Sequence, residues 1–200
     1  MAQGRNSAVF LNDSIISLTE KTFDTHLIDK LSFALKLNTR YPLRDFMMQY
    51  EESDYAHVAR RLADVGVAFY RQYDEESNED AIILTDHSYG WLKGPAIPYR
   101  HPSGLFDGGL ESVWDMLVIR SAVPKQVGVN DDNYRDAQSD MQAEVKTSEE
   151  YRALRATDNR WAEHYPDAGK AYQEQPGQGI WYAGIRRERH LCKLVMFEGK

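Results

Sequence analysis

Apolar residues recur at helical spacing through the first third of the chain. Behind the capping-box sequence Ser17-Leu-Thr-Glu20, apolar side chains return every three or four positions, which predicts an amphipathic helix over 18–37. Proline fits the first turn of a helix, so Pro42 and the apolar positions after it predict a short second helix over 42–50. The longest apolar stripe begins after a serine cap and predicts a third helix over 53–73.

The pattern changes after residue 80. Residues 81–85 are apolar without a helical period and predict a short buried strand. The stretch 86–110 is rich in glycine, proline and aromatic residues, and it is too aromatic for a disordered linker. We therefore expect one long ordered loop there, followed by an apolar core helix over 110–122 that ends before Pro124.

The last third of the chain is more polar. Residues 130–175 favour helix but have narrow apolar stripes, which predicts peripheral polar helices packed outside the core or against a partner. Two β-rich runs flank a basic turn and predict a C-terminal β-hairpin over 180–197, which pairs with the 81–85 strand in a small sheet. No internal repeat is visible in the sequence.

These elements predict an α+β fold that is mainly helical. We expect a helix bundle-like core with a small C-terminal antiparallel hairpin or sheet and one long ordered loop. The 200 residues and 23.0 kDa fit a single domain over 1–200, and a hydrophobic fraction of 42% is enough to build its core. Cys192, the one cysteine, excludes an internal disulfide and a multi-cysteine zinc site.

Charge and targeting signals narrow the classes of protein. The formal net charge of −7 argues against a simple electrostatic nucleic-acid binder, which has a basic surface. The first residues lack the continuous apolar region of a signal peptide, and no apolar window is long enough to span a membrane. We therefore expect an intracellular, cytoplasmic protein that has no membrane partner.

Histidine and arginine side chains in the 86–110 loop are candidates for catalysis. His87 follows Asp86 and His101 follows Arg100, so either histidine could act as a general base while the arginine grips an anionic substrate. The alternative is structural, with both histidines hydrogen-bonded to loop carbonyls. Their spacing matches no zinc or iron pattern and the loop glycines form no phosphate or dinucleotide motif, so we expect no metal and no cofactor.

Aromatic side chains in the same loop are candidates for contact with a partner. Aromatic and arginine residues dominate interaction hot spots, and Trp91, Tyr99, Arg100 and Phe106 are of these types. The alternative is that they fold back as a lid over the core.

Basic residues gather at the turn of the predicted hairpin. Arg186, Arg187 and Arg189 lie close to Trp181, and basic residues beside aromatic ones are typical of single-stranded nucleic-acid binding. The alternative is a solvated hairpin turn, or a small basic patch for an acidic protein partner.

The absence of catalytic motifs favours a non-enzymatic protein for interaction or assembly. It would be a small acidic inhibitor or a subunit of a larger complex, including complexes of viral type, with a protein partner; a homo-oligomer also stays open. One alternative is a hydrolase or transferase for a small substrate that uses His87 or His101 with Arg100. Another is nucleic-acid binding through the basic hairpin.

Replacing Trp91 and Tyr99 together with alanine should abolish partner binding without unfolding the domain, because both are large aromatic side chains of the kind that dominates interaction hot spots. A pull-down from the native host measures this binding, and a thermal melt checks that the variant is folded. A partner that the double variant retains unchanged would contradict the prediction.

Overall fold

Two compact units make up the computed structural model of the chain. They comprise Met1–Gly94 and Pro95–Lys200, and each is described by itself. The structure describes residues 1–26, 33–74, 78–100, 111–133, 137–147, 154–161, 165 and 178–199. These residues form ten strands, three α-helices and one short 3-10 helix, so the mainly helical, bundle-like fold expected from the sequence is wrong.

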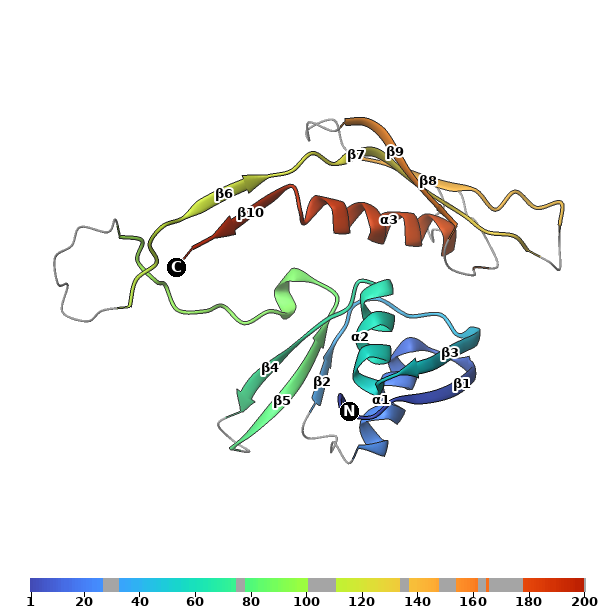
Figure 1. The fold of residues 1–200 in the computed structure, drawn as a ribbon, viewed down its shortest axis with the longest axis horizontal. Helices are drawn as coiled ribbons and strands as arrows, with labels where there is room; N and C mark the ends of the chain where they lie inside the picture. The colour runs from blue at the N-terminus through green and yellow to red at the C-terminus, as the bar shows by residue number, and fades with distance from the viewer. Residues whose placement is uncertain are drawn as a thin grey trace. The chain divides into compact units, whose positions relative to one another are not determined.

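The first unit contains two small groups of strands and two helices among its described residues. Its elements are β1 (Asn6–Asp13), α1 (Ile15–Thr25), β2 (Phe33–Lys36), β3 (Arg44–Glu52), α2 (Asp54–Asp64), β4 (Ala68–Asp74), β5 (Glu79–Thr85) and the 3-10 turn η2 (Ser88–Gly90). Strands β1 and β3 pair antiparallel in a two-stranded β1–β3 ribbon, and β5 lies between parallel β2 and antiparallel β4 (Figure 1). Helices α1 and α2 pack on each other and bury Leu18, Phe23, Val58 and Leu62.

A polar joint connects β1 to α1. Asn12 has a left-handed backbone (φ 52°), which turns the chain out of the strand. The hydroxyl of Ser14 then accepts the backbone N–H of Ser17 and caps the helix. The carboxylate of Asp13 binds Lys21 on the helix at 2.5 Å, which fixes the angle between strand and helix.

The joint between β3 and α2 repeats this arrangement. Glu51 is left-handed (φ 47°), Ser53 caps another helix of 11 residues, and the carboxylate of Glu52 binds Arg60. Each of these residues lies 39 positions after its counterpart in the first joint, for example Ser53 after Ser14. The first unit therefore contains a structural repeat that the sequence does not reveal, because these serines are the only residues of the two joints that are identical.

Strand pairing relates the two copies of the repeat. Val9 pairs with Met48, which is its own counterpart at the same offset. When a residue pairs antiparallel with the residue that occupies the same position in the other copy of the repeat, a twofold axis passes between the two. An approximate twofold axis through the β1–β3 ribbon therefore relates the two strand-helix segments. Equivalent positions of β1 and β3 consequently face their helices.

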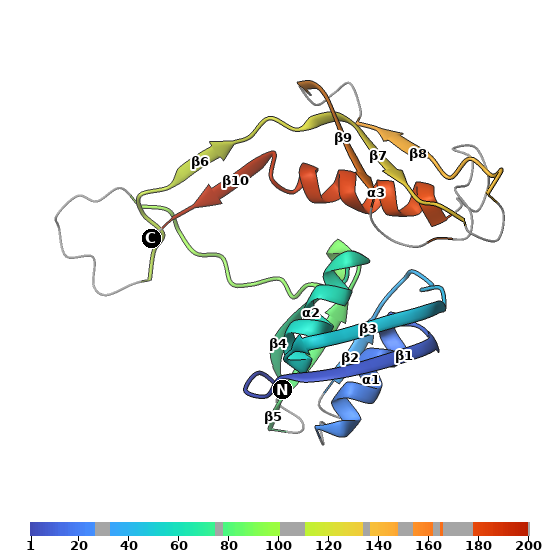
Figure 2. The same cartoon turned by 45° about the vertical axis from the view of Figure 1, so that its right-hand side comes forward.

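The second unit combines a sheet, a helix and a second ribbon. Its described elements are β6 (Leu117–Arg120), β7 (Pro124–Asn130), β8 (Ala143–Lys146), β9 (Leu154–Trp161), α3 (Gln178–Leu191) and β10 (Val195–Glu198). Strand β7 lies between antiparallel β8 and parallel β9, and α3 packs on β7 and β8. Strands β6 and β10 pair antiparallel as the β6–β10 arm, which extends away from α3 and the sheet (Figures 1 and 2).

Several predicted helices are strands in the structure. The helix predicted over 18–37 ends at Thr25, as α1, and the helix predicted over 42–50 is strand β3. The helix predicted over 53–73 is correct only as far as Asp64, where α2 ends. Gly66, with φ 75°, ends α2 and lets the chain turn into β4. The apolar residues that continue the helical stripe beyond this point are β-formers, and pairing with β5 decides their conformation.

The second half of the chain differs more from the prediction. The expected core helix over 110–122 contains strand β6, and the expected helices over 130–175 contain β8 and β9. The first run of the expected hairpin belongs to α3, and β10 pairs with β6 instead of a neighbouring strand. The 81–85 strand is confirmed as part of β5, but it does not pair with β10.

No helix among the described residues is both long enough and apolar enough to cross a membrane.

Gly184 distinguishes the observed helix α3 from the expected hairpin. A Cβ atom at this position meets nothing within 4 Å, so Gly184→Ala should raise the free energy of unfolding by about 0.5 to 1 kcal/mol. Gly184→Pro should lower it by about 3 kcal/mol or more, because proline removes a helical hydrogen bond. Urea unfolding measures both effects, and a proline variant as stable as the parent would contradict the helix.

Candidate functional site

Asp86 holds the end of β5 to the segment that follows β2. Its carboxylate accepts the backbone N–H groups of Asn38 at 2.9 Å and Thr39 at 2.8 Å, the hydroxyl of Tyr41 at 2.9 Å, and a contact from His87 Nδ1 at 3.0 Å. Burial alone would raise the pKa of Asp86, but these hydrogen bonds outweigh it and hold the pKa well below its ordinary value. The carboxylate beside His87 is thus engaged as a structural anchor.

The catalytic candidates are not brought together by the described residues. His87 belongs to the first unit and Arg100 to the second, and His101 lies outside the described residues. Whether they converge on a substrate stays a prediction. Among the residues that the structure describes, no three histidine, cysteine or acidic side chains gather in a way that could hold a metal ion.

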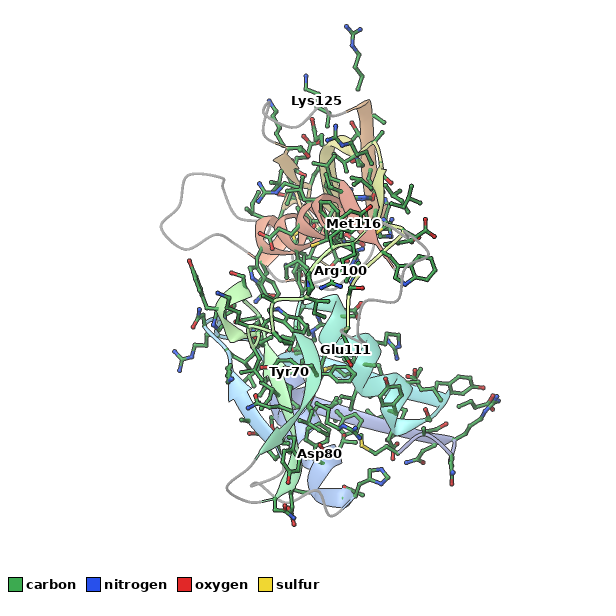
Figure 3. The ribbon with its side chains drawn as sticks, turned by 90° about the vertical axis from the view of Figure 1, so that its left-hand side faces the viewer. Tyr70, Asp80, Arg100, Glu111, Met116 and Lys125 are labelled. Atoms are coloured by element: carbon green, nitrogen blue, oxygen red, sulfur yellow. The ribbon has the colours of Figure 1, made fainter. Side chains whose placement is uncertain are left out.

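Trp91 is fixed on one face and open on the other. Its ring stacks on Tyr70 of β4 at 5.0 Å, and the hydroxyl of Tyr70, labelled in Figure 3, donates to the carbonyl of Gly90 at 2.7 Å. The side chain of Trp91 is 50% exposed, and neighbouring Tyr89 is 92% exposed. The start of the predicted loop therefore presents aromatic rings on a rigid support, as a contact with a partner requires.

The other predicted partner contacts lie in the second unit. Tyr99 forms a parallel bridge with Val113, and the backbone N–H of Arg100 donates to the Val113 carbonyl at 2.9 Å. Phe106 lies outside the described residues. Contact of these side chains with a partner stays a prediction.

The basic residues lie on a helix and not at a hairpin tip. Arg186, Arg187 and Arg189 belong to α3, as does Trp181. Helix α3 buries Tyr182 against its own unit. The expected hairpin location is wrong, and nucleic-acid binding by these residues stays a prediction.

The β1–β3 ribbon has one covered face and one bare face. Alternate residues point toward the helices and include Phe10, Met47 and Gln49. The opposite face presents large apolar side chains that are 43% to 65% exposed: Val9, Leu11, Phe46, Met48 and Tyr50. None of these five is charged. Sequence reasoning missed this face because both strands are apolar at covered and bare positions alike, which hides the period of two.

The β6–β10 arm presents exposed apolar side chains on both of its faces. Five of them are 39% to 67% exposed: Leu117, Val118, Val195, Met196 and Phe197. Met116, labelled in Figure 3, directly precedes the arm and is exposed as well. Contiguous apolar surfaces of this kind usually mark sites of protein–protein contact. The arm and the β1–β3 ribbon are therefore the candidate interaction surfaces.

A family model described as phage tail baseplate hub (GPD) matches residues 1–200. The chain belongs to the phage tail baseplate hub family. Membership of the hub family confirms the general class predicted from the sequence, a component of an assembly, and it agrees with the expectation of a larger complex of viral type. The small acidic inhibitor is set aside.

Relatives of this hub-family chain are longer proteins. The type VI secretion system spike protein VgrG4b of Pseudomonas aeruginosa is 28% identical over 106 residues, which cover 52% of this chain and 13% of the relative. The solved E. coli c3393 protein, described as a component of the type VI secretion system with similarity to the T4 tail proteins gp27 and gp5, has a TM-score of 0.62 at 21% identity and covers 99% of this chain and 37% of that chain.

A second similar solved structure is the 43 kDa tail protein of prophage MuSo2 from Shewanella oneidensis. It has a TM-score of 0.47 at 14% identity, over 96% of this chain and 50% of that chain. The hub-family chain thus spans half or less of the length of each of these relatives. The likeness to the E. coli structure shows the fold, and that fold is not a helical bundle.

Asp86→Asn should lower the free energy of unfolding of the first unit by about 1 to 3 kcal/mol near pH 7, because the backbone N–H groups of Asn38 and Thr39 and the hydroxyl of Tyr41 lose a charged acceptor. Since the folded pKa of Asp86 is lowered, its contribution is complete above the unfolded-state value of about 3.9 and is lost as the pH falls through the folded pKa. Urea unfolding at pH values from about 3 to 7 measures the difference.

The control is Asp24→Asn, which removes an exposed carboxylate from α1. It should show no such pH-dependent difference from the parent. An Asp86→Asn penalty that is the same at pH 3 and pH 7 would contradict the anchor.

Proposed function

We propose that this chain is a structural part of a phage-tail-like hub or type VI secretion spike assembly. In this role it holds neighbouring protein subunits through uncharged apolar β-surfaces. The observation that carries the proposal is the bare face of the β1–β3 ribbon, in a chain that belongs to the baseplate hub family.

The energetics of apolar exposure support this role. Full burial of a valine, leucine, phenylalanine or methionine side chain contributes about 1.5 to 3 kcal/mol. The five side chains of the ribbon face are roughly half exposed, so covering them contributes on the order of 5 kcal/mol. A gain of this size favours a chain that works inside an assembly over one that works alone.

The names of the relatives support the kind of assembly. The Pseudomonas protein is named a spike protein of the type VI secretion system, and the E. coli protein is described as a component of that system with similarity to phage tail proteins. Both are much longer than this chain, so their partners come to it only as part of the proposal. We add Trp91, Tyr99, Arg100 and Phe106 as further contacts to these partners, and self-association of the chain as one of its contacts.

Particles isolated from the native host test the proposal. The parent chain should sediment with particles far larger than 23.0 kDa, and mass spectrometry should identify tail or spike proteins in the same fraction. The variant Phe46→Ser/Tyr50→Ser should shift at least tenfold toward the free fraction, because a loss of about 1.4 kcal/mol already weakens binding tenfold.

A matched control is Trp161→Ser, which removes an exposed apolar side chain from β9 outside both candidate surfaces. It should sediment like the parent. A parent chain that sediments free in cells where such particles form would contradict the proposed function.

A further inference from the structure

We propose that the joint between β3 and α2 is an acid-sensitive switch, in which uptake of a proton by the buried imidazole of His57 releases α2 from the β1–β3 ribbon. The inference goes beyond the proposed function and does not depend on it. It rests on the burial of His57, on a ring nitrogen without a hydrogen-bond partner, and on a comparison with the joint between β1 and α1.

His57 connects α2 to both strands of the ribbon. Its side chain is only 1% exposed. Nδ1 of the imidazole lies 2.8 Å from the carboxylate of Glu52, at the end of β3. The ring also stacks on Phe10 of β1, with ring centroids 5.8 Å apart and an angle of 17° between the planes. The position of α2 on the ribbon therefore depends on this imidazole.

The neutral form of His57 fits these surroundings. An ionised carboxylate can only accept hydrogen bonds, so Nδ1 donates its hydrogen to Glu52. The guanidinium of Arg60 lies 3.3 Å from Nδ1 and donates to the same carboxylate, so both donors share one acceptor. Nε2 then carries a lone pair and no hydrogen, and it has no hydrogen-bond partner among the residues that the structure describes.

The protonated form of His57 does not fit. A proton on Nε2 makes this nitrogen a buried, charged donor, and no acceptor for it lies among the described residues. Burial accordingly lowers the pKa of His57, although the carboxylate of Glu52 opposes this effect. Repulsion from Arg61 and Arg60 lowers the pKa further, since the ion pair of Arg61 with Asp64 is long, at 3.9 Å. The imidazole therefore takes up a proton more readily once α2 has moved away and water reaches the ring.

Other charged groups of the two joints are engaged in contacts of their own. Asp13 of β1 binds Lys21 of α1, and Asp54 of α2 lies 2.6 Å from Nε2 of His26 at the end of α1. The guanidinium of Arg61 donates to a backbone carbonyl of β3 at 3.3 Å. None of these contacts involves Nε2 of His57, so none of them compensates a proton there.

The joint between β1 and α1 shows that packing alone does not require a histidine. Leu18 lies 39 positions before His57, at the equivalent place in the repeat, and its side chain is fully buried. An apolar side chain is thus sufficient to fill this position beneath a serine-capped helix. Of the two equivalent positions, only the one in α2 carries a group that titrates, so acid should act on α2 and spare α1.

Release of α2 changes the support of the bare ribbon face. Helices α1 and α2 pack on each other, and the covered side of the ribbon lies toward them. Without α2, only α1 remains to hold the two strands in shape. Contacts made through the bare face should therefore weaken in mild acid.

His57→Leu tests the switch, because it gives α2 the residue that α1 has at the equivalent position. The folded pKa of His57 is lowered, so its contribution to stability is complete above the unfolded-state value of about 6.5. Below that value the folding equilibrium constant of the parent falls by up to about tenfold per pH unit, until the folded pKa is reached.

Urea unfolding of the 200-residue parent and of His57→Leu, from about pH 5 to pH 8, gives the ratio of their folding equilibrium constants. The ratio of parent to variant should be constant above about pH 7.5 and roughly threefold lower, or more, at pH 5. Groups that titrate equally in both proteins cancel in this ratio. A ratio that stays constant down to pH 5 would overturn the inference.

Amide hydrogen exchange shows which helix opens. Between pH 7 and pH 5, the protection factors of α2 should fall more than those of α1 in the parent, and this difference should disappear in His57→Leu. The control is His26→Gln, which removes a histidine whose side chain is 30% exposed and reaches water in the folded state. This variant should keep the selective loss of protection in α2. Equal losses in α1 and α2 of the parent would contradict a switch at this joint.

Nuclear magnetic resonance titration of the His57 ring in the parent needs no variant. Its midpoint should lie below the ordinary value of about 6.5, and a midpoint at or above that value would overturn the inference even if His57→Leu fails to fold. The sedimentation test of the proposed function is made near neutral pH, where His57 is neutral in the folded chain. The two proposals can therefore fail separately.

Discussion

A two-stranded β-ribbon has two faces, and within its own unit each face is covered only where a helix of the same chain packs on it. This constraint shapes both units. In the first unit, α1 and α2 cover one side of the β1–β3 ribbon and leave the side with Phe46 and Tyr50 bare. In the second unit, α3 packs on β7 and β8, and the chain then continues as β10 in an arm without a covering layer. Apolar surface that the fold cannot bury within each unit becomes the surface available for assembly.

Polar groups keep the first ribbon in a fixed shape. At the second joint, Glu52 binds Arg60 and lies 2.8 Å from Nδ1 of buried His57. Hydrogen bonding from Arg60, with His57 also contributing and burial opposing, lowers the pKa of Glu52, while burial lowers the pKa of His57 against the pull of that carboxylate. The imidazole stacks on Phe10 of the covered face, so a charged clamp and an aromatic stack act on the same two strands.

Family membership and structure bear on different questions. The match over residues 1–200 places the chain among phage tail baseplate hubs, and it supports the assembly class that the lack of catalytic motifs had predicted. The structure locates the surfaces through which an assembly component could act. Trp91, a candidate partner contact from the sequence, is half exposed and stacks on Tyr70, whereas the sequence does not indicate the larger apolar surfaces on β3 and β10.

The sequence alone determined the features that depend on neighbours along the chain. Ser53 as a helix cap and 81–85 as a buried strand both follow from the local pattern of the sequence, and the structure has both. Tertiary structure decided the rest, because residues 44–52 and 117–120 have apolar patterns that suit helix and strand equally. The first segment pairs with β1, where Met47 lies opposite Phe10, 37 positions away, and the second pairs with β10, where Val118 lies opposite Phe197, 79 positions away. No local pattern encodes such long-range pairing.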